Sequence, residues 1–189
     1  MKKIKGREEI DVETINKVLY WFFAYPSREI GLSDLANETK IAKTTANRIV
    51  RNMEKAGVLE VTRIGKVWRI KVNQENGLYR QMKVAYNVGR IYREELKERI
   101  LEYMPNPQTI VLFGSCRYGT DTEKSDIDIA VEVIGEEEIQ IIDIGEMDVG
   151  YRKNVPVRLH IFSRNKVDLN VFNSIANGIV MWGFLEVRP

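Results

Sequence analysis

Four residues near the middle of the chain have types and spacing that suit metal and phosphate chemistry. Asp126 and Asp128 lie two positions apart in an alternating run, so a strand places both carboxylates on one face and Ile127 on the other. Two like charges at this separation repel unless a cation lies between them, and hard oxygen ligands suit Mg²⁺. Upstream, Gly114 lets the backbone approach a phosphate, and Ser115 adds a hydroxyl to the amides around it. The alternative is a surface β-hairpin with two solvated aspartates.

These residues belong to a segment, residues 109–133, whose elements come in a characteristic order. An apolar strand over 110–113 runs into Gly114-Ser115, a polar loop follows over 116–125, and a second strand carries the two aspartates. In this order the segment resembles the nucleotidyltransferase superfamily that includes DNA polymerase beta, and within it the minimal nucleotidyltransferase group. The resemblance implies Mg²⁺ or Mn²⁺ as cofactor and a nucleoside triphosphate as substrate or ligand. It assigns metal binding and catalysis to Asp126 and Asp128, and nucleotide binding to Gly114, Ser115, Arg117 and Ser125.

A third carboxylate is the feature of active members of that superfamily that is not evident here. The resemblance places it on the strand after an intervening helix, which we expect over residues 135–148. The expected third strand, over 155–162, carries Pro156, Arg158 and His160 along one face and no acid. His160 is then either a general base or a packed strand histidine. Arg158 either meets a phosphate or pairs with an acid, and nucleotidyl transfer stays an open question.

The composition indicates a soluble globular protein with one large or two small domains. The chain has 189 residues, of which 44% are hydrophobic and 30% charged, and no apolar run approaches the roughly 20 residues that span a membrane. Its one cysteine, Cys116, excludes an internal disulfide and agrees with a cytoplasmic location; we expect a loop residue rather than a nucleophile. Residues 1–104 carry 21 Lys/Arg and 14 Asp/Glu, whereas residues 105–189 carry 8 and 13. This asymmetry favours two domains with different partners.

The N-terminal part predicts three helices followed by a β-hairpin. Apolar residues at three- and four-residue spacing indicate a helix over 11–24, a short helix capped by Ser33 follows, and a third helix covers 41–57, where Gly57 ends it. Two strands, over 58–63 and 67–72, are joined by a turn. This order resembles the winged helix-turn-helix domain of bacterial and archaeal regulators.

The outward face of the third predicted helix is basic and polar. Between residues 40 and 71 there are nine Lys/Arg against two acids, and such a helix can enter the major groove of DNA while flanking cations meet phosphates. The alternative is a solvated basic face used for protein contacts. The DNA-binding residues that we predict are Lys43, Thr44, Thr45, Asn47, Arg48, Arg51, Arg63 and Lys66.

Between the two parts, a long helix is expected to about residue 103, bent near Gly89, and residues 78–103 are a candidate homodimer contact. A further helix over 168–177 and an apolar end complete the chain. The predicted fold class is therefore α+β in two domains. These are a winged helix-turn-helix domain (1–75), a linker helix (76–104) and a nucleotidyltransferase domain with a small mixed sheet and helices (105–189).

Two functions agree with these patterns. The first is a DNA-binding protein whose nucleotidyltransferase domain binds Mg²⁺ and a nucleoside triphosphate and transfers an NMP group to a hydroxyl acceptor. The second is a transcriptional regulator whose nucleotidyltransferase-like domain is catalytically degraded and serves as a nucleotide sensor or an assembly module. No membrane partner is expected.

Overall fold

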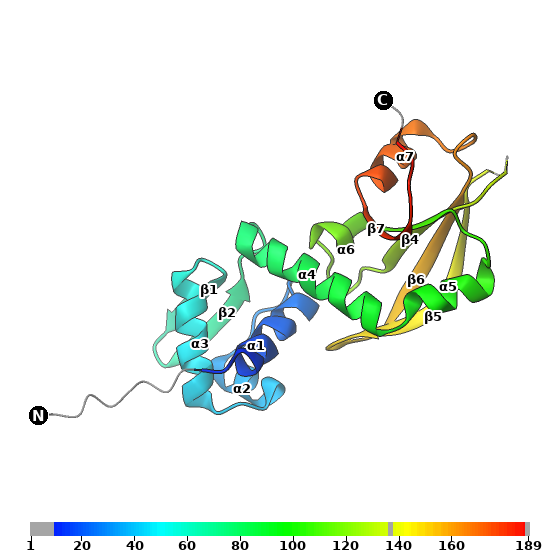
Figure 1. Ribbon diagram of the computed structural model, residues 1–189. Coiled ribbons are helices and arrows are strands. Elements are labelled where there is room, and N and C mark those ends of the chain that lie inside the picture. Colours follow the sequence, from blue (N-terminus) through cyan, green and yellow to red (C-terminus); the bar gives the residue numbers. More distant parts are fainter. Residues whose placement is uncertain (1–9, 136–137, 188–189) are drawn as a thin grey trace, which may run out of the picture. The chain divides into compact units, whose positions relative to one another are not determined.

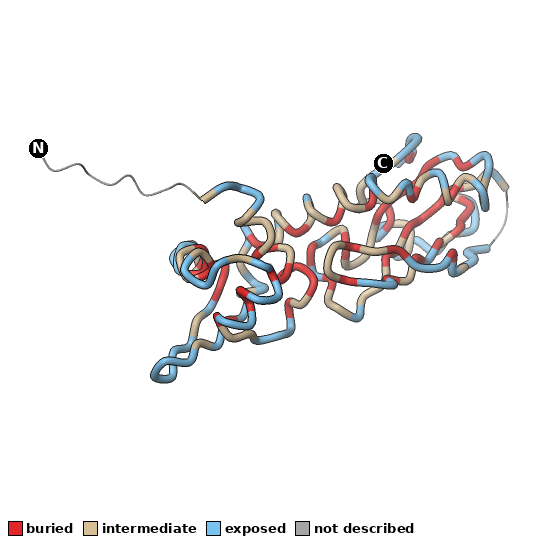
Figure 2. Tube along the Cα trace, turned by 90° about the horizontal axis from the view of Figure 1, so that it is seen from below, coloured by how far each residue is buried: buried red, intermediate tan, exposed pale blue. Residues whose placement is uncertain are grey.

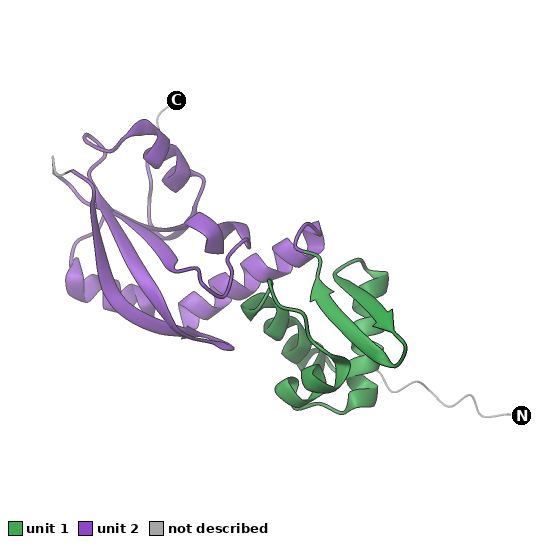
Figure 3. Ribbon diagram, turned by 180° about the vertical axis from the view of Figure 1, so that it is seen from behind, with its two compact units in different colours: residues 1–73 green, residues 74–189 purple. Residues whose placement is uncertain are grey.

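The chain divides into two compact units, Met1–Asn73 and Gln74–Pro189 (Figure 3). The computed structural model describes residues 10–135 and 138–187. Both units mix helices with a sheet, as the α+β class requires (Figure 1). None of the described helices combines the length and the apolar character that crossing a bilayer requires.

Unit 1 contains three helices and a two-stranded antiparallel sheet, which is the winged helix-turn-helix arrangement. The elements are α1 (Val12–Ala24), α2 (Leu32–Thr39), α3 (Lys43–Lys55), β1 (Leu59–Ile64) and β2 (Val67–Val72). Asp11 caps α1 by accepting a hydrogen bond of 2.8 Å from the backbone N–H of Thr14. The predicted cap at Ser33 is wrong, because α2 starts at Leu32 and its N-cap is Gly31, two residues earlier.

The core of unit 1 follows the apolar periodicity of its helices. Phe22 of α1, Leu35 of α2, Ile49 of α3 and Ile70 of the wing are all fully buried. Figure 2 shows the buried stretches of the chain in red. Gly57 has a φ of 70°, a left-handed conformation that a residue with a Cβ adopts with strain, and the helix ends before it. Packing therefore fixes which face of α3 points outward.

Unit 2 is built on a five-stranded sheet with the strand order β5-β6-β4-β3-β7. The pair β4–β6 is parallel and the other pairs are antiparallel. The helices are α4 (Gly77–Arg93), α5 (Leu96–Tyr103), α6 (Gly114–Tyr118) and α7 (Leu169–Ala176), and the strands are β3 (Thr109–Phe113), β4 (Ile127–Glu132), β5 (Gln140–Val149), β6 (Arg152–Phe162) and β7 (Ile179–Gly183).

Alternate residues of the sheet strands pack into two apolar clusters, one on each face of the sheet. On one face, Ile127 and Ile129 of β4 pack with Ile91 of α4 and Ile100 of α5. On the other face, Ala130 packs with residues that include Ile175 of α7. The helices α4 and α5 therefore cover one side of the sheet and α7 part of the other (Figure 1). This arrangement leaves the remainder of the α7 face available for polar side chains.

Three local predictions are corrected by the structure. Residues 135–148 were expected to be helical, but Gln140–Val149 is strand β5, because apolar and polar residues alternate there at the period of a strand. The long helix is broken at Glu95, whose φ is 51°, and not near Gly89. Cys116 lies in the short helix α6 and not in a loop. Burial raises the pKa of the Cys116 thiol well above its usual range, so it does not supply a thiolate.

Candidate functional site

The turn from β3 into α6 places the backbone directly against Asp128. Gly114 has a φ of 68°, and a Cβ at this position would lie 2.6 Å from Asp128 Oδ2. Both observations require glycine, first because of the left-handed backbone and second because of the missing space. The structure therefore brings together the predicted Gly114-Ser115 turn and the second aspartate.

Asp126 immediately precedes β4 and Asp128 lies within it, with the buried Ile127 between them. Their side chains are 23% and 22% exposed. Asp126 Oδ2 lies 2.7 Å from Nη1 of Arg158, and Asp128 Oδ1 lies 3.0 Å from Nε2 of His160. Both aspartates are thus held by basic side chains of the neighbouring strand.

The pairing of β4 with β6 explains these contacts. In the parallel register Asp128 is opposite Arg158 and Ala130 is opposite His160, so the basic residues stand on the same face as the aspartates. The imidazole of His160 also makes an edge-to-face contact with Phe113, with the ring centroids 4.9 Å apart. This strand is where the superfamily resemblance led us to look for a third carboxylate. The structure has an arginine and a histidine there instead.

A divalent metal ion does not fit this set of donors as it stands. Mg²⁺ takes oxygen ligands in near-octahedral geometry, and here each aspartate has an oxygen engaged by a basic side chain. Over residues 10–135 and 138–187, no group of three or more His, Cys, Asp or Glu side chains is arranged to hold a metal ion. The geometry is that of two acid–base pairs.

The other two predicted nucleotide ligands contact neighbouring parts of the domain. Arg117 donates a hydrogen bond of 2.6 Å from Nε to the carbonyl oxygen of Asn177, and its guanidinium lies 4.7 Å from the centre of the Tyr118 ring. Ser125 accepts a hydrogen bond of 2.9 Å from the backbone N–H of Thr122. Arg117 therefore connects α6 to the end of α7, and Ser125 stabilises the loop that precedes Asp126.

A buried ionic cluster beneath the loop before β4 was missed by sequence reasoning. The Asp121 side chain is 2% exposed; its Oδ1 accepts 2.8 Å from Asn87 Nδ2, and its Oδ2 accepts 3.1 Å from Arg152 Nη1. Lys83 donates from Nζ to the Asp121 carbonyl oxygen. Burial lowers the pKa of Lys83, while the Asp121 carboxylate opposes that change. The guanidinium of Arg152 also donates to the carbonyl oxygen of Ser125, so the cluster positions the residue before Asp126.

One signal in the sequence could have revealed this cluster. Lys83, Asn87 and Ile91 recur at four-residue spacing and are all buried, so two polar side chains occupy the inward face of α4. The apolar Leu78 near the start of this helix is instead 50% exposed. Hydrophobicity alone therefore does not identify the buried face at the start of α4.

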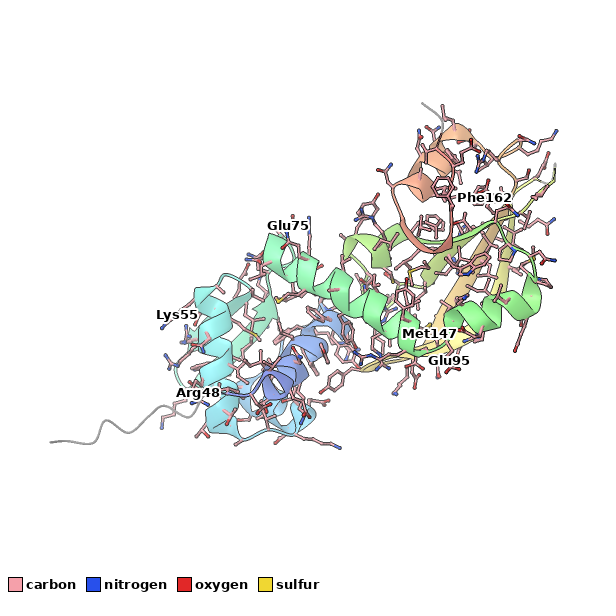
Figure 4. All side chains as sticks on the ribbon, viewed as in Figure 1. Arg48, Lys55, Glu75, Glu95, Met147 and Phe162 are labelled. Atoms are coloured by element: carbon pink, nitrogen blue, oxygen red, sulfur yellow. The ribbon has the colours of Figure 1, made fainter. Side chains whose placement is uncertain are left out.

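On α3 the predicted DNA-binding residues lie on the outward face. Lys43, Thr44 and Arg51 are exposed and Thr45, Asn47 and Arg48 are partly exposed; Arg48 and Lys55 are labelled on α3 in Figure 4. Nε of Arg51 donates 2.8 Å to Oδ1 of Asn47. Within the described part of the chain, Lys43, Arg51 and Lys55 form no ion pair.

The wing contributes one cation that is paired with an acid, Arg63, and one that is not, Lys66, among the described residues. Arg63 donates two hydrogen bonds, of 2.9 and 2.5 Å, to the carboxylate of Glu54 on α3, and its guanidinium lies 4.7 Å from the centre of the Trp68 ring. Its charge is therefore partly offset within unit 1. Lys66 follows the turn at Gly65, is exposed, and has no acidic partner among the described residues.

Comparison with known proteins identifies the C-terminal region. The model of the nucleotidyltransferase domain family matches residues 90–180. A comparison with curated protein sequences gave no match. Structural similarity was found to the DNA-binding protein Sso10a-2 from Sulfolobus solfataricus, with 14% identity and a TM-score of 0.34 over 47% of this chain and 93% of that one.

Two further solved structures are similar to this chain at the same low level. A possible transcriptional regulator from Methanosarcina mazei shares 16% identity with a TM-score of 0.33 over 50% of this chain and 80% of that one. FabT from Streptococcus pneumoniae in complex with DNA shares 14% identity with a TM-score of 0.34 over 52% of this chain and 66% of that one. These values carry no conclusion about function. The family match and the β3–α6–β4 turn together show that residues 90–180 of this chain form a nucleotidyltransferase domain.

Proposed function

We propose that this chain is a DNA-binding regulator whose nucleotidyltransferase domain does not transfer nucleotides. The observation that carries the DNA-binding part is the outward face of α3, where Lys43, Arg51 and Lys55 are exposed without an acidic partner among the described residues. A helix of 13 residues is about 20 Å long and fits a major groove about 12 Å wide.

In this arrangement the start of α3 meets base edges and its later cations meet phosphates. Thr44, Thr45 and Asn47 offer short polar side chains near the N-terminal end, which suits direct contacts with bases. Arg51 and Lys55 lie further along the helix and suit phosphate contacts. Lys66 at the wing turn adds a contact to the neighbouring backbone. The partner is therefore duplex DNA, bound largely through phosphate neutralisation.

The acid–base pairs of unit 2 support the absence of transfer. Metal-assisted nucleotidyl transfer uses cations that clamp the attacking and leaving oxygens. Arg158 and His160 engage the two carboxylates that would hold such cations. Gly114 and Ser115 remain available for a phosphate group, so the domain keeps a place for a nucleotide as an effector.

The experiment that tests DNA binding is fluorescence anisotropy of labelled duplexes over a series of salt concentrations. The duplexes are drawn from the upstream region of the protein's own gene, with a scrambled duplex of equal length. We expect log Kd to rise linearly with log salt concentration, because bound cations release counterions from DNA. Binding that is absent at low salt, or independent of salt, would contradict the proposal.

Nucleotidyl transfer is the second candidate function. It is favoured by Asp128 on β4, which lies beside Gly114, and by Asp126, which immediately precedes that strand. Incubation with α-labelled nucleoside triphosphates in Mg²⁺ or Mn²⁺, with and without cell extract, tests it. Label transfer by the native chain that disappears in Asp128→Ala would establish the enzyme and overturn the non-transferring proposal. We expect no transfer in either protein.

A homodimer through residues 78–103 remains a further prediction. Exposed Leu78, Tyr92 and Tyr103 supply apolar area along α4 and α5. Two copies related by a two-fold axis would bind a palindromic DNA site. Light scattering at low micromolar concentration decides it: a mass near the 21.9 kDa of one chain would exclude the dimer.

A further inference from the structure

We infer that Arg158 and His160 occupy the place of the divalent cation in the nucleotidyltransferase domain, so that both aspartates are engaged without metal and bind metal only when these two side chains are removed. This inference deepens the non-transferring part of the proposed function and does not depend on DNA binding.

The first support is the position of the two basic groups. They contact one oxygen each of the paired carboxylates, at 2.7 Å for Arg158 with Asp126 and 3.0 Å for His160 with Asp128. Each contact lies within hydrogen-bond distance, so each basic side chain occupies a position from which an ion would otherwise contact the carboxylate. A guanidinium keeps its positive charge at any pH that the fold survives. Arg158 is therefore a permanent counter-charge.

The second support is the way Asp128 is enclosed from both sides. Its Oδ2 lies so close to the α6 turn that a Cβ on Gly114 would stand 2.6 Å away. Its Oδ1 faces the imidazole of His160, which Phe113 holds by an edge-to-face contact. A metal ion would have to displace an imidazole that two contacts orient. The enclosed carboxylate favours the hydrogen bond over a hydrated ion.

The third support is an acid on the next strand. In the register of β5 with β6, Asp143 is opposite Arg158, and Arg158 is in turn opposite Asp128 on β4. Arg158 therefore stands in a row between two acids, with Asp126 in contact as well. Removing the guanidinium leaves three carboxylates on one face of the sheet. Asp126 and Asp128 then favour a divalent cation between them, and Asp143, two strands from Asp128, adds negative charge rather than a third ligand.

The test compares Mn²⁺ binding and thermal unfolding of the native chain with those of a double variant, Arg158→Ala/His160→Asn. For the native chain we expect no Mn²⁺ binding tighter than about 1 mM by calorimetry or electron paramagnetic resonance. We also expect a midpoint of thermal unfolding that Mg²⁺, Mn²⁺ and chelator leave unchanged. The double variant should unfold at a lower temperature in metal-free buffer and recover by about 3 °C or more when Mn²⁺ is added.

Two controls assign the effect to this site. Lys153→Ala removes the cation from another acid–base pair of the same sheet, with Asp148, and should give no Mn²⁺ binding. Adding Asp126→Asn and Asp128→Asn to the double variant should abolish the Mn²⁺ binding that the double variant gained.

Each outcome decides the inference. Native chain that binds Mn²⁺ at micromolar concentration and loses it in Asp128→Asn overturns it. A folded double variant that binds no Mn²⁺ also overturns it. If the double variant does not fold, the milder double variant Arg158→Gln/His160→Asn replaces it, with the same expected gain of Mn²⁺ binding. DNA affinity, measured on the same samples, should not change, which separates failure of this inference from failure of DNA binding.

Discussion

The two units place their charged side chains in opposite ways. In the described residues of unit 1 no charged side chain is buried, and the outward face of α3 keeps three cations without acidic partners. Unit 2 buries Lys83, Asp121, Glu132 and Arg152. It also turns Arg158 toward an acid of its own sheet. The same residue types are thus exposed in one unit and packed into the fold in the other.

This difference between the units follows from how exposure and burial change the hydration of a charged side chain. A cation at the surface stays hydrated, contributes little to stability, and remains free to neutralise a phosphate. A buried charge loses its hydration and is tolerated only when partners compensate it, so it fixes the parts of the chain that supply those partners. Exposure of the basic residues therefore points to recognition, and burial points to positioning.

Removing the acid at the centre of the buried cluster should have the largest effect. Asp121→Ala leaves Lys83 and Arg152 buried without their shared carboxylate, and we expect a loss of about 3–5 kcal/mol in the free energy of unfolding. Denaturant unfolding followed by circular dichroism measures it. Glu98→Ala, an exposed acid on α5, is the control and should change little. A loss for Asp121→Ala no larger than that of Glu98→Ala would mean that the cluster is not structural.

A substitution in the turn that packs against Asp128 should have the second-largest effect on the free energy of unfolding. Gly114→Ala forces a residue with a Cβ into a left-handed backbone and into the Asp128 carboxylate, and we expect a loss of about 1–3 kcal/mol. The matched control is Gly89→Ala in α4, where a Cβ meets nothing within 4 Å and the helix should gain about 0.5–1 kcal/mol. Denaturant unfolding should therefore show changes of opposite sign in the free energy of unfolding of the two variants. Two equal losses would contradict the assignment of the strain to Gly114.

A smaller effect is expected on DNA affinity from the outward cations. Lys43→Gln/Arg51→Gln removes two cations from α3, so the slope of log K against log salt concentration should fall by about 2 and the Kd should rise by about tenfold or more. Anisotropy on the same duplexes measures both. Lys17→Gln on α1, whose lysine is paired with Glu13, is the control and should leave the slope unchanged. An unchanged slope in the double variant would place the DNA contact elsewhere.

The sequence predicted what depends on local periodicity and on short motifs. The buried stripe of α3, the stop at Gly57 and the strand that carries Asp126 and Asp128 each follow from spacing within a few residues. These features need no knowledge of which segments meet in space. They were sufficient to identify the three helices with the wing and the nucleotidyltransferase turn.

Features that depend on distant pairing were not predictable. The alternation of apolar and polar residues in strand β5 is interrupted around Gly145, where the register with β6 shifts, so the segment was predicted as a helix and only its pairing with β6 identifies it as a strand. The buried side of α4 is set by an acid 38 residues away, at position 121, and not by apolar residues. The roles of Arg158 and His160 were left open in the sequence for the same reason. The parallel register of β4 with β6 explains why both side chains contact the aspartates.

Breaking the ion pair between Glu54 and Arg63 should have the smallest effect. This pair is exposed, yet it joins a cation of the wing to an acid of its own unit. Glu54→Gln removes an acid from α3 and releases Arg63 toward DNA, so the salt slope should rise by up to about 1.

In the native chain the hydrogen bonds from Arg63 hold the pKa of Glu54 below its usual value. Because the pKa is lower in the folded state, the pair stabilises the fold at neutral pH and loses its effect as the pH falls through that lowered value. The native chain should therefore exceed Glu54→Gln in stability at pH 7 and match it in acid. Glu38→Gln, an exposed acid on α2, should show neither change, and an equal slope in Glu54→Gln would mean that Arg63 does not reach DNA.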